Sequence, residues 1–249
     1  MTAEYLLIDV GNGRTKFALA TRDALLEQCD APTVELTAET LSDMLKNWKW
    51  TRAVCASVVP CASETLRAFL GDSMLLLKHD SALGIGIRYP KPESIGADRL
   101  ANAVALVHLH GAPGIVIDFG TAVTFDIVDR DACYVGGVIA PGLRLMTDYL
   151  HERTALLPRV ELCEPDSVIG KTTEQAILAG AAFGYRGMVR GLLEALRTEL
   201  GAPNDLRVIA TGGDAAWIAS GLPEIQVVDE DLTLQGLRLV ARLEAVGQS

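Results

Sequence analysis

Two aspartates, Asp9 and Asp118, each end a short apolar run and are followed by a glycine-centred turn. The first stretch, residues 6–17, reads LLIDVGNGRTKF, and the second, residues 114–126, reads GIVIDFGTAVTFD. Because glycine lacks a Cβ, backbone N–H groups in such a turn can approach an anion closely. A carboxylate beside them can hold a cation. Each stretch therefore predicts a hairpin that forms half of a site for a polyphosphate and its metal.

The two stretches form a weak internal repeat. Laying the first aspartate on the second also matches Gly11 with Gly120 and Thr15 with Thr124. Self-similarity at about half the chain length indicates two similar units side by side, with a cleft between them as the expected site. For either copy alone, an aspartate followed by glycine is also ordinary turn chemistry. The repetition favours the functional interpretation.

A third candidate is the sequence GADR at 96–99, which follows an irregular loop and opens a predicted helix. Asp98 and Arg99 then lie where free backbone N–H groups and the positive end of the helix dipole attract anions. An aspartate in a first turn is also a common helix cap, so spacing alone leaves both roles open. Tyr89, just upstream, fits either the core or the rim of such a site.

Two further glycine-rich stretches, GGVIAPG at 136–142 and TGG at 211–213, indicate backbone that passes close to another group. The second could lie against a nucleotide base or ribose. The stretch GKTT at 170–173 resembles the end of a Walker A motif, but Pro165 stands where its first glycine belongs, so that interpretation fails. No Ser-His-Asp or Cys-His arrangement has supporting context, which leaves the chemistry to carboxylates.

Composition excludes several classes of protein. With 22 Lys and Arg against 32 Asp and Glu, the formal charge is −10, and no basic cluster suits a nucleic acid or an anionic membrane. No apolar run approaches the ~20 residues of a spanning helix, and the N-terminus, MTAEYLLIDV, lacks a basic region typical of a signal peptide. Five scattered cysteines without a CxxC pair predict reduced thiols, no zinc site and a cytoplasmic location.

Hydrophobic periodicity predicts an α/β fold in which each half begins with three strands. In the first half we expect strands at 3–9, 15–21, 24–29, 52–59 and 73–78, with helices at 37–47, 61–70 and 97–110 and a loop at 80–95. In the second half we expect strands at 114–118, 122–129, 132–139, 206–211 and 224–228, with helices at 142–156, 173–200, 214–220 and 231–246. The repeated order predicts a mixed sheet with helical cover in each half.

The motifs, taken in order, resemble those of type III pantothenate kinases. They are DVGN at 9–12 with Lys16, GADR at 96–99, DFGTAVTFD at 118–126, GGVIAPG at 136–142, GKTT at 170–173, TGG at 211–213 and LTLQGL at 232–237. The resemblance covers nearly the whole chain. It implies the fold of the acetate and sugar kinase, Hsp70 and actin superfamily, with tandem ribonuclease-H-like domains at 1–112 and 113–249, mixed sheets and an inter-domain cleft.

The resemblance further implies ATP-dependent phosphorylation of pantothenate to 4′-phosphopantothenate, the first step of coenzyme A biosynthesis. It implies Mg²⁺, a monovalent cation (K⁺ or NH₄⁺) and a homodimer. By motif, the residues that bind ATP are Asp9, Val10, Gly11, Asn12, Gly13, Arg14, Thr15, Lys16 and Thr121, and Asp118 holds the monovalent cation. Those that contact pantothenate are Tyr89, Gly96, Ala97, Asp98, Arg99 and Thr173, with Asp98 as the general base.

Two departures and two alternatives accompany this prediction. The family usually has Thr or Ser where this chain has Gly13, and Lys16 occurs in only some of its branches. The alternatives are a kinase of another small hydroxy acid or sugar, and a catalytically silent relative with a regulatory role. For the homodimer we expect an interface on the helix at 176–196, on the face formed by Ile177, Ala181, Gly184, Met188 and Leu192.

Overall fold

The structure is a computed structural model that describes residues 3–71, 73–201 and 205–247. Its strands are β1 (Tyr5–Val10), β2 (Arg14–Ala20), β3 (Leu25–Pro32), β4 (Arg52–Ser57), β5 (Met74–Leu76), β6 (Gly86–Ile87), β7 (Gly114–Phe119), β8 (Ala122–Val128), β9 (Cys133–Pro141), β10 (Arg207–Thr211) and β11 (Val227–Val228). Its α-helices are α1 (Ala38–Leu45), α2 (Pro60–Leu70), α3 (Ala97–Ala105), α4 (Leu143–Arg153), α5 (Thr173–Ala179), α6 (Tyr185–Glu199), α7 (Ala215–Ala219) and α8 (Leu232–Gly247).

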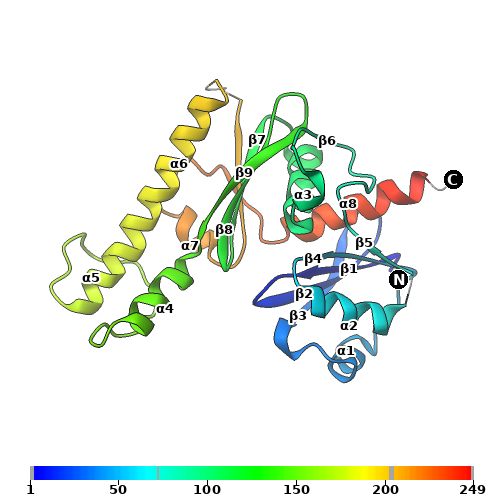
Figure 1. The fold of residues 1–249 in the computed structure, drawn as a ribbon, viewed down its shortest axis with the longest axis horizontal. Helices are drawn as coiled ribbons and strands as arrows, with labels where there is room; N and C mark the ends of the chain where they lie inside the picture. The colour runs from blue at the N-terminus through cyan, green and yellow to red at the C-terminus, as the bar shows by residue number, and fades with distance from the viewer. Residues whose placement is uncertain (1–2, 72, 202–204, 248–249) are drawn as a thin grey trace. The chain divides into compact units, whose positions relative to one another are not determined.

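The two sheets repeat one strand order (Figure 1). The first runs β3-β2-β1-β4-β5, and the second runs β11-β10-β7-β8-β9-β6, so β9 to β11 matches β3 to β5 and β6 is an addition. In both sheets the central strand, β1 or β7, has a parallel neighbour that follows a helical crossover. The predicted α/β fold with duplicated mixed sheets is confirmed.

The described chain divides into two compact units. One comprises residues 1–112, 126–136 and 231–249, and the other comprises 113–125 and 137–230. Strands β8 and β9 therefore run through both, and α8 belongs to the first. The predicted domains, 1–112 and 113–249, stay a prediction, because compactness alone does not define a domain that folds independently.

The two hairpins at the repeated aspartates differ by one residue. In the first, the N–H of Gly11 donates to the carbonyl of Arg14 at 3.0 Å, and in the second, the N–H of Gly120 donates to the carbonyl of Ala122 at 3.2 Å. When the burial patterns of β2 and β8 are aligned, buried Thr15 in the first copy of the repeat corresponds to buried Val123 in the second. The match of Thr15 with Thr124 is wrong, because a one-residue shift moves a strand side chain to the other face.

In the first unit, helices α1 and α2 cover one face of the first sheet. Alternate strand residues, among them Leu6, Ile8 and Phe17, point into this core and meet Leu41 of α1 and Leu66 of α2. Helix α1 begins at a reciprocal cap, in which the side chains of Thr37 and Thr40 accept each other's backbone N–H groups. Helix α8 packs on β1 and β4.

Three local features differ from the predicted pattern. Strand β6 lies within the expected loop at 80–95, and helix α4 ends at Arg153, which leaves the segment at 154–172 without helix or strand. π-helical turns follow α3 at Leu106–His110 and α5 at Gly180–Gly184, the second of which we call η4. The predicted long helix at 173–200 is therefore α5, η4 and α6 in succession. Among the described residues, no helix has the length and hydropathy that crossing a membrane requires.

Helices α3 and α8 cross at unusually close range in the first unit. A Cβ built on Gly236 would overlap the carbonyl oxygen of Ala101 and lie 2.6 Å from its carbonyl carbon. Beside this contact, the hydroxyl of Thr233 donates to Asn102 Oδ1 at 2.8 Å, with both residues buried. Glycine at 236 is therefore required by the backbone of α3, although glycine weakens a helix.

We expect Gly236→Ala to lower the free energy of unfolding by about 1–3 kcal/mol, the usual effect of overpacking. Helix propensity alone predicts the opposite sign, a gain of about 1 kcal/mol, so the two explanations separate in one urea titration. The control is Arg242→Ala on the exposed side of the same helix, which should change stability by less than about 0.5 kcal/mol. A stabilised Gly236→Ala protein would contradict the close crossing.

Candidate active site

The turn between β1 and β2 is held by hydrogen bonds from Thr33. Its hydroxyl donates to the carbonyl of Gly11 at 2.7 Å and lies 3.0 Å from the hydroxyl of buried Thr15, and its N–H donates to the carbonyl of Gly13 at 3.1 Å. Thr33 holds the turn by these bonds, and residues 12 and 13 of the turn are exposed. The sequence analysis missed Thr33, because it lies in the 3₁₀ turn after β3.

The predicted ATP-binding residues of this turn divide into two groups. Asp9 and Lys16 are directly opposite in the antiparallel register of β1 and β2, and both are half-buried. Directly opposite side chains lie on the same face of the sheet, close enough for charges to interact. In the other group, Asn12, Gly13 and Arg14 are exposed, and Arg14 forms an ion pair with Asp30 of β3. Val10 and Thr15 of this group are buried instead.

Glycine-rich stretches that the sequence singled out meet at the end of β7. A Cβ built on Gly212, whose φ is +94°, would lie 2.5 Å from Asp118 Oδ1 and 2.6 Å from the carbonyl oxygen of Phe119. A Cβ on Gly142 would overlap the carbonyl oxygens of Gly120 and Thr121. Only glycine fits at 142 and 212. The structure thus brings together Asp118, Thr121 and the two stretches at 136–142 and 211–213.

At the start of α3, Gly96 is the N-cap and Asp98 lies in the first turn. Asp98 Oδ1 accepts the N–H of Arg99 at 2.8 Å, and a Cβ on Gly96 would lie 2.5 Å from the same oxygen. Burial raises the pKa of Asp98, and the bond to the Arg99 N–H and the Arg99 charge oppose this only partly. Asp98 is therefore a better proton acceptor than an exposed aspartate.

The Arg99 side chain is held by an acidic and aromatic cluster. Its Nε donates to Asp126 Oδ1 at 2.6 Å, with the Asp126 side chain fully buried and that of Arg99 13% exposed. The guanidinium lies over the ring of Tyr134 at 5.7 Å, and the Tyr134 hydroxyl is 3.4 Å from Asp126 Oδ1. Burial, and next the charge of Asp126, raises the pKa of Tyr134, so its hydroxyl stays protonated and donates.

Strand β6 places Tyr89 beside this cluster. Ile87 pairs with Tyr134 in the parallel register of β6 and β9, and the N–H of Arg88 donates to the Tyr134 carbonyl at 2.8 Å. The rings of Tyr89 and Tyr134 then meet edge to face with centroids 6.1 Å apart. Tyr89, Asp98 and Arg99, which the sequence grouped together, lie in one unit together with Asp126 and Tyr134.

The sequence analysis assigned no role to Asp126 or Tyr134. Asp126 carried a signal, since it is a carboxylate inside the otherwise apolar run TFDIV of β8. Tyr134 carried none, because an aromatic residue in a strand is ordinary core. Thr173 is the exposed first residue of α5, behind the Thr172 cap, and belongs to the second unit. Its contact with substrate stays a prediction.

We expect Asp126→Asn to lower the free energy of unfolding by about 3 kcal/mol, because it leaves the Arg99 guanidinium without its buried counter-charge. The matched control is Asp131→Asn, which breaks the ion pair of Asp131 with Arg88, where both side chains are more than half exposed. Exposed pairs contribute about 0–1 kcal/mol. Urea unfolding of both variants tests the difference. Equal losses in the two proteins would show that Asp126 is not a buried anchor.

Comparison with known proteins finds relatives along most of this chain. The family described as type III pantothenate kinase matches residues 5–195. A type III pantothenate kinase of Akkermansia muciniphila is 50% identical over 240 residues, which covers 96% of this chain and 98% of that protein. One of Methylacidiphilum infernorum is 45% identical over 239 residues, covering 96% and 88%.

Structural similarity extends to more distant kinases. The inorganic polyphosphate/ATP-glucomannokinase of Arthrobacter sp. strain KM has a TM-score of 0.51 at 16% identity, with 100% of each chain covered. Likeness at this identity shows the shared actin-like kinase fold alone. The family match and the relatives, together with the carboxylates and glycine turns described above, show that this chain belongs to the type III pantothenate kinase family.

Proposed function

We propose that this chain transfers the γ-phosphoryl group of ATP to the primary hydroxyl of pantothenate, giving 4′-phosphopantothenate for coenzyme A biosynthesis. Relatives over nearly the whole length are type III pantothenate kinases. The observation within this chain that carries the proposal is the pair Asp98 and Arg99. A desolvated carboxylate lies next to a guanidinium fixed on buried Asp126.

Asp98 is the proposed general base. The substrate hydroxyl must lose its proton as its oxygen bonds to phosphorus, and a positioned carboxylate can accept that proton. Because burial raises the pKa of Asp98, its proton affinity is closer to what proton transfer near neutral pH requires. The carboxylate accepts only when ionised, so turnover falls as the pH drops through this raised pKa.

Arg99 is the proposed contact for the pantothenate carboxylate. Asp126 holds the guanidinium on its Nε edge and Tyr134 lies under its plane, so the orientation of the group is set before substrate binds. A planar guanidinium binds a carboxylate by two parallel hydrogen bonds, which an ammonium cannot do. This explains how a chain with a formal charge of −10 selects an acid.

ATP is proposed to lie on the two glycine turns, with its phosphates near Asp9 to Lys16 and near Thr121. The residues fit a phosphate, since these turns are exposed at residues 12–13 and 120–121 and carry no side chain at the glycines. Among the described residues, no cluster of three or more His, Cys, Asp or Glu is placed to hold a metal. Mg²⁺ would therefore bind mainly through the nucleotide phosphates, as is usual in kinases.

The monovalent cation is proposed at Asp118. Its Oδ1 and the carbonyl oxygen of Phe119 both lie close to Gly212, since a Cβ built there would be 2.5 and 2.6 Å from them, so two oxygen ligands are available at this end of β7. Oxygen ligands of this kind suit a hard cation. When bound, K⁺ or NH₄⁺ would offset the negative charge of the polyphosphate next to an acidic protein.

A homodimer is part of the proposal, through the surface of α4, α5, η4 and α6. This surface exposes large apolar side chains, among them Leu145, Tyr149 and Phe183, and such patches commonly mark interfaces. The interface predicted on the helix at 176–196 needs one correction, because Ala181 is buried within its own chain. We also propose a cytoplasmic location, where ATP and reduced thiols occur together.

We expect Asp98→Asn to reduce kcat by roughly 10²- to 10⁴-fold, the usual contribution of a general base, with the apparent affinity for ATP retained. Folding should not suffer. The pKa of Asp98 is raised in the folded state, so its stabilising contribution is greatest below the unfolded pKa and is lost as the pH rises through the folded pKa. At neutral pH, removing the charge should leave the free energy of unfolding unchanged or increased.

Steady-state kinetics with pantothenate and a urea titration test both statements. Arg99→Lys serves as the comparison, because it keeps the charge but loses the planar fork, and should mainly raise the pantothenate KM. If Asp98→Asn folds normally and keeps more than about a tenth of wild-type turnover, Asp98 is not the base.

Turnover should also depend on the monovalent cation, because cation size selects among sites of fixed oxygen ligands. Replacing K⁺ or NH₄⁺ by Na⁺ or Li⁺ at constant Mg²⁺ should sharply lower kcat. Gly212→Ala should remove this dependence together with most activity, because its Cβ would displace Asp118 Oδ1 and the Phe119 carbonyl from their present positions. Equal rates in all four salts would contradict a cation at Asp118.

A further inference from the structure

The segment from 154 to 172 joins α4 to α5 without helix or strand of its own. Loops longer than about 12–15 residues in a compact fold are usually either functional or linkers, and contacts within the fold favour a functional loop. Its first part is tied to α4, since the Leu157 carbonyl lies 2.9 Å from His151 Nδ1. Its last part packs on α5, where a Cβ on Gly170 would lie 2.5 Å from the carbonyl carbon of Gln175 and the Gln175 side chain accepts the N–H of Lys171 at 2.9 Å.

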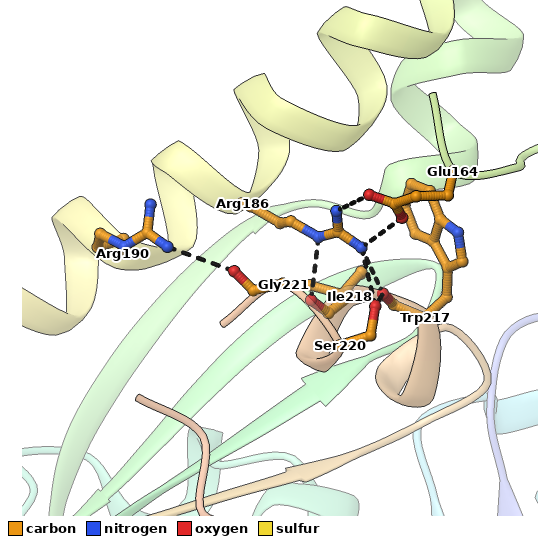
Figure 2. Close-up of polar contacts among 7 residues, drawn as sticks. All are labelled: Glu164, Arg186, Arg190, Trp217, Ile218, Ser220 and Gly221. Carbon is orange, nitrogen blue, oxygen red and sulfur yellow. Dashed lines mark hydrogen bonds and ion pairs between the residues drawn. The ribbon is translucent and has the colours of Figure 1, made fainter. Parts of the chain in front are cut away.

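The middle of the segment is held by one arginine (Figure 2). Arg186, near the start of α6, donates from Nη1 to Glu164 Oε1 at 2.7 Å and from Nη2 to Glu164 Oε2 at 2.9 Å. This is the two-bond, planar contact that gives a guanidinium and a carboxylate both strength and direction. The Arg186 side chain is 7% exposed, whereas that of Glu164 is 56% exposed.

The same guanidinium caps the C-terminal end of α7. Its Nε donates to the Ile218 carbonyl at 3.2 Å, and its Nη2 donates to the Trp217 carbonyl at 2.7 Å and to Ser220 Oγ at 3.1 Å. The Trp217 ring lies 4.9 Å from its central carbon, and a Cβ on Gly221 would lie 2.5 Å from its Nε. The site for Arg186 is therefore built around that residue.

Helices α4 and α5 flank an open pocket of about 440 Å³, lined mainly by apolar groups such as Met146 and Leu150 of α4 and Ile177 of α5. The π-helical turn η4 separates α5 from α6, and such turns commonly allow a helix to bend.

We propose that Arg186 and Glu164 are positioning residues for the acceptor substrate. Their contact fixes the segment at 154–172 and the start of α5, and so holds Thr173 where it contacts pantothenate. This inference rests on the proposed function, in which Thr173 is a pantothenate contact. It assigns a role to residues 154–169, for which the sequence motifs predicted no function.

Glu164 suits this role better than one in overall stability. Because it is more than half exposed, its ion pair is partly screened by solvent. Removing its charge leaves Arg186 with two carbonyls, a hydroxyl and the Trp217 ring as partners. The neutral partners keep Arg186 hydrogen-bonded but do not replace its counter-charge, so the loss should lower the stability of the second unit, which the urea titration measures separately from KM. The segment at 154–172 loses the contact that holds its middle.

The test uses Glu164→Gln, with Glu161→Gln as the matched control. Glu161 is an exposed residue of the same segment, so its substitution changes the net charge equally. A urea titration first confirms that each full-length variant is folded. Two measurements follow: the rate of trypsin cleavage after exposed Arg159, and kcat and KM for each substrate. Glu164→Asp, which keeps the charge but shortens the side chain, gives a second variant.

For Glu164→Gln we expect cleavage after Arg159 to accelerate roughly fivefold to tenfold, the change expected when one hydrogen bond of ordinary net strength is lost. The pantothenate KM should rise by a similar factor, with kcat and the ATP KM within about twofold of wild type. The cleavage rate and pantothenate KM of Glu164→Asp should lie between those of wild type and Glu164→Gln, and those of Glu161→Gln should match wild type. A merely structural role would not separate the two KM values.

Three results would overturn the proposal: an unchanged pantothenate KM in Glu164→Gln, an equal rise in both KM values, or an effect of the same size in Glu161→Gln. Failure of the proposed function has a different signature. In that case the wild type and the Glu161→Gln control would show no turnover with pantothenate at all, and the inference would fail with it.

Discussion

The buried ion pair between Arg99 and Asp126 is the constraint on which the acceptor site depends. A guanidinium that is 13% exposed needs a counter-charge, and without one the desolvation penalty is several kcal/mol. That requirement places a carboxylate inside β8, among residues that otherwise fill the core. It also explains Tyr134, whose hydroxyl and ring serve the same two groups, and β6, which carries Tyr89 to the edge of the cluster.

Asp98 stands next to this pair along the chain, but its side chain has a different environment. Asp126 is stabilised as an anion by the guanidinium at 2.6 Å, whereas desolvation outweighs the Arg99 contacts at Asp98 and raises its pKa. Two aspartates beside one arginine thus differ in their burial and hydrogen bonds. One remains a fixed charge that orients Arg99, and the other is suited to accept a proton.

Much of this arrangement could be predicted from local sequence. The succession of strands and helices in each half followed from alternating apolar runs and from the repeat at Asp9 and Asp118, and glycines that end strands marked where backbones approach. Gly142 and Gly212 confirm that interpretation, since a Cβ on either would overlap or crowd backbone near Asp118. An alternating strand pattern and a glycine at a strand end can both be recognised in the local sequence, without knowledge of the distant residues that they contact.

The missed features depend on partners distant in the sequence. Strand β6 spans only two residues, too few to show a period, and exists because β9 offers it an edge. Likewise, Glu164 resembles any exposed carboxylate until Arg186 lies beside it. The wrong match of Thr15 with Thr124 has the same origin, because the second hairpin closes one residue earlier where Gly142 packs against it. The repeat is preserved at β1 and β7 with their aspartates, whereas the register of the following strand, β2 or β8, is determined by the turn before it.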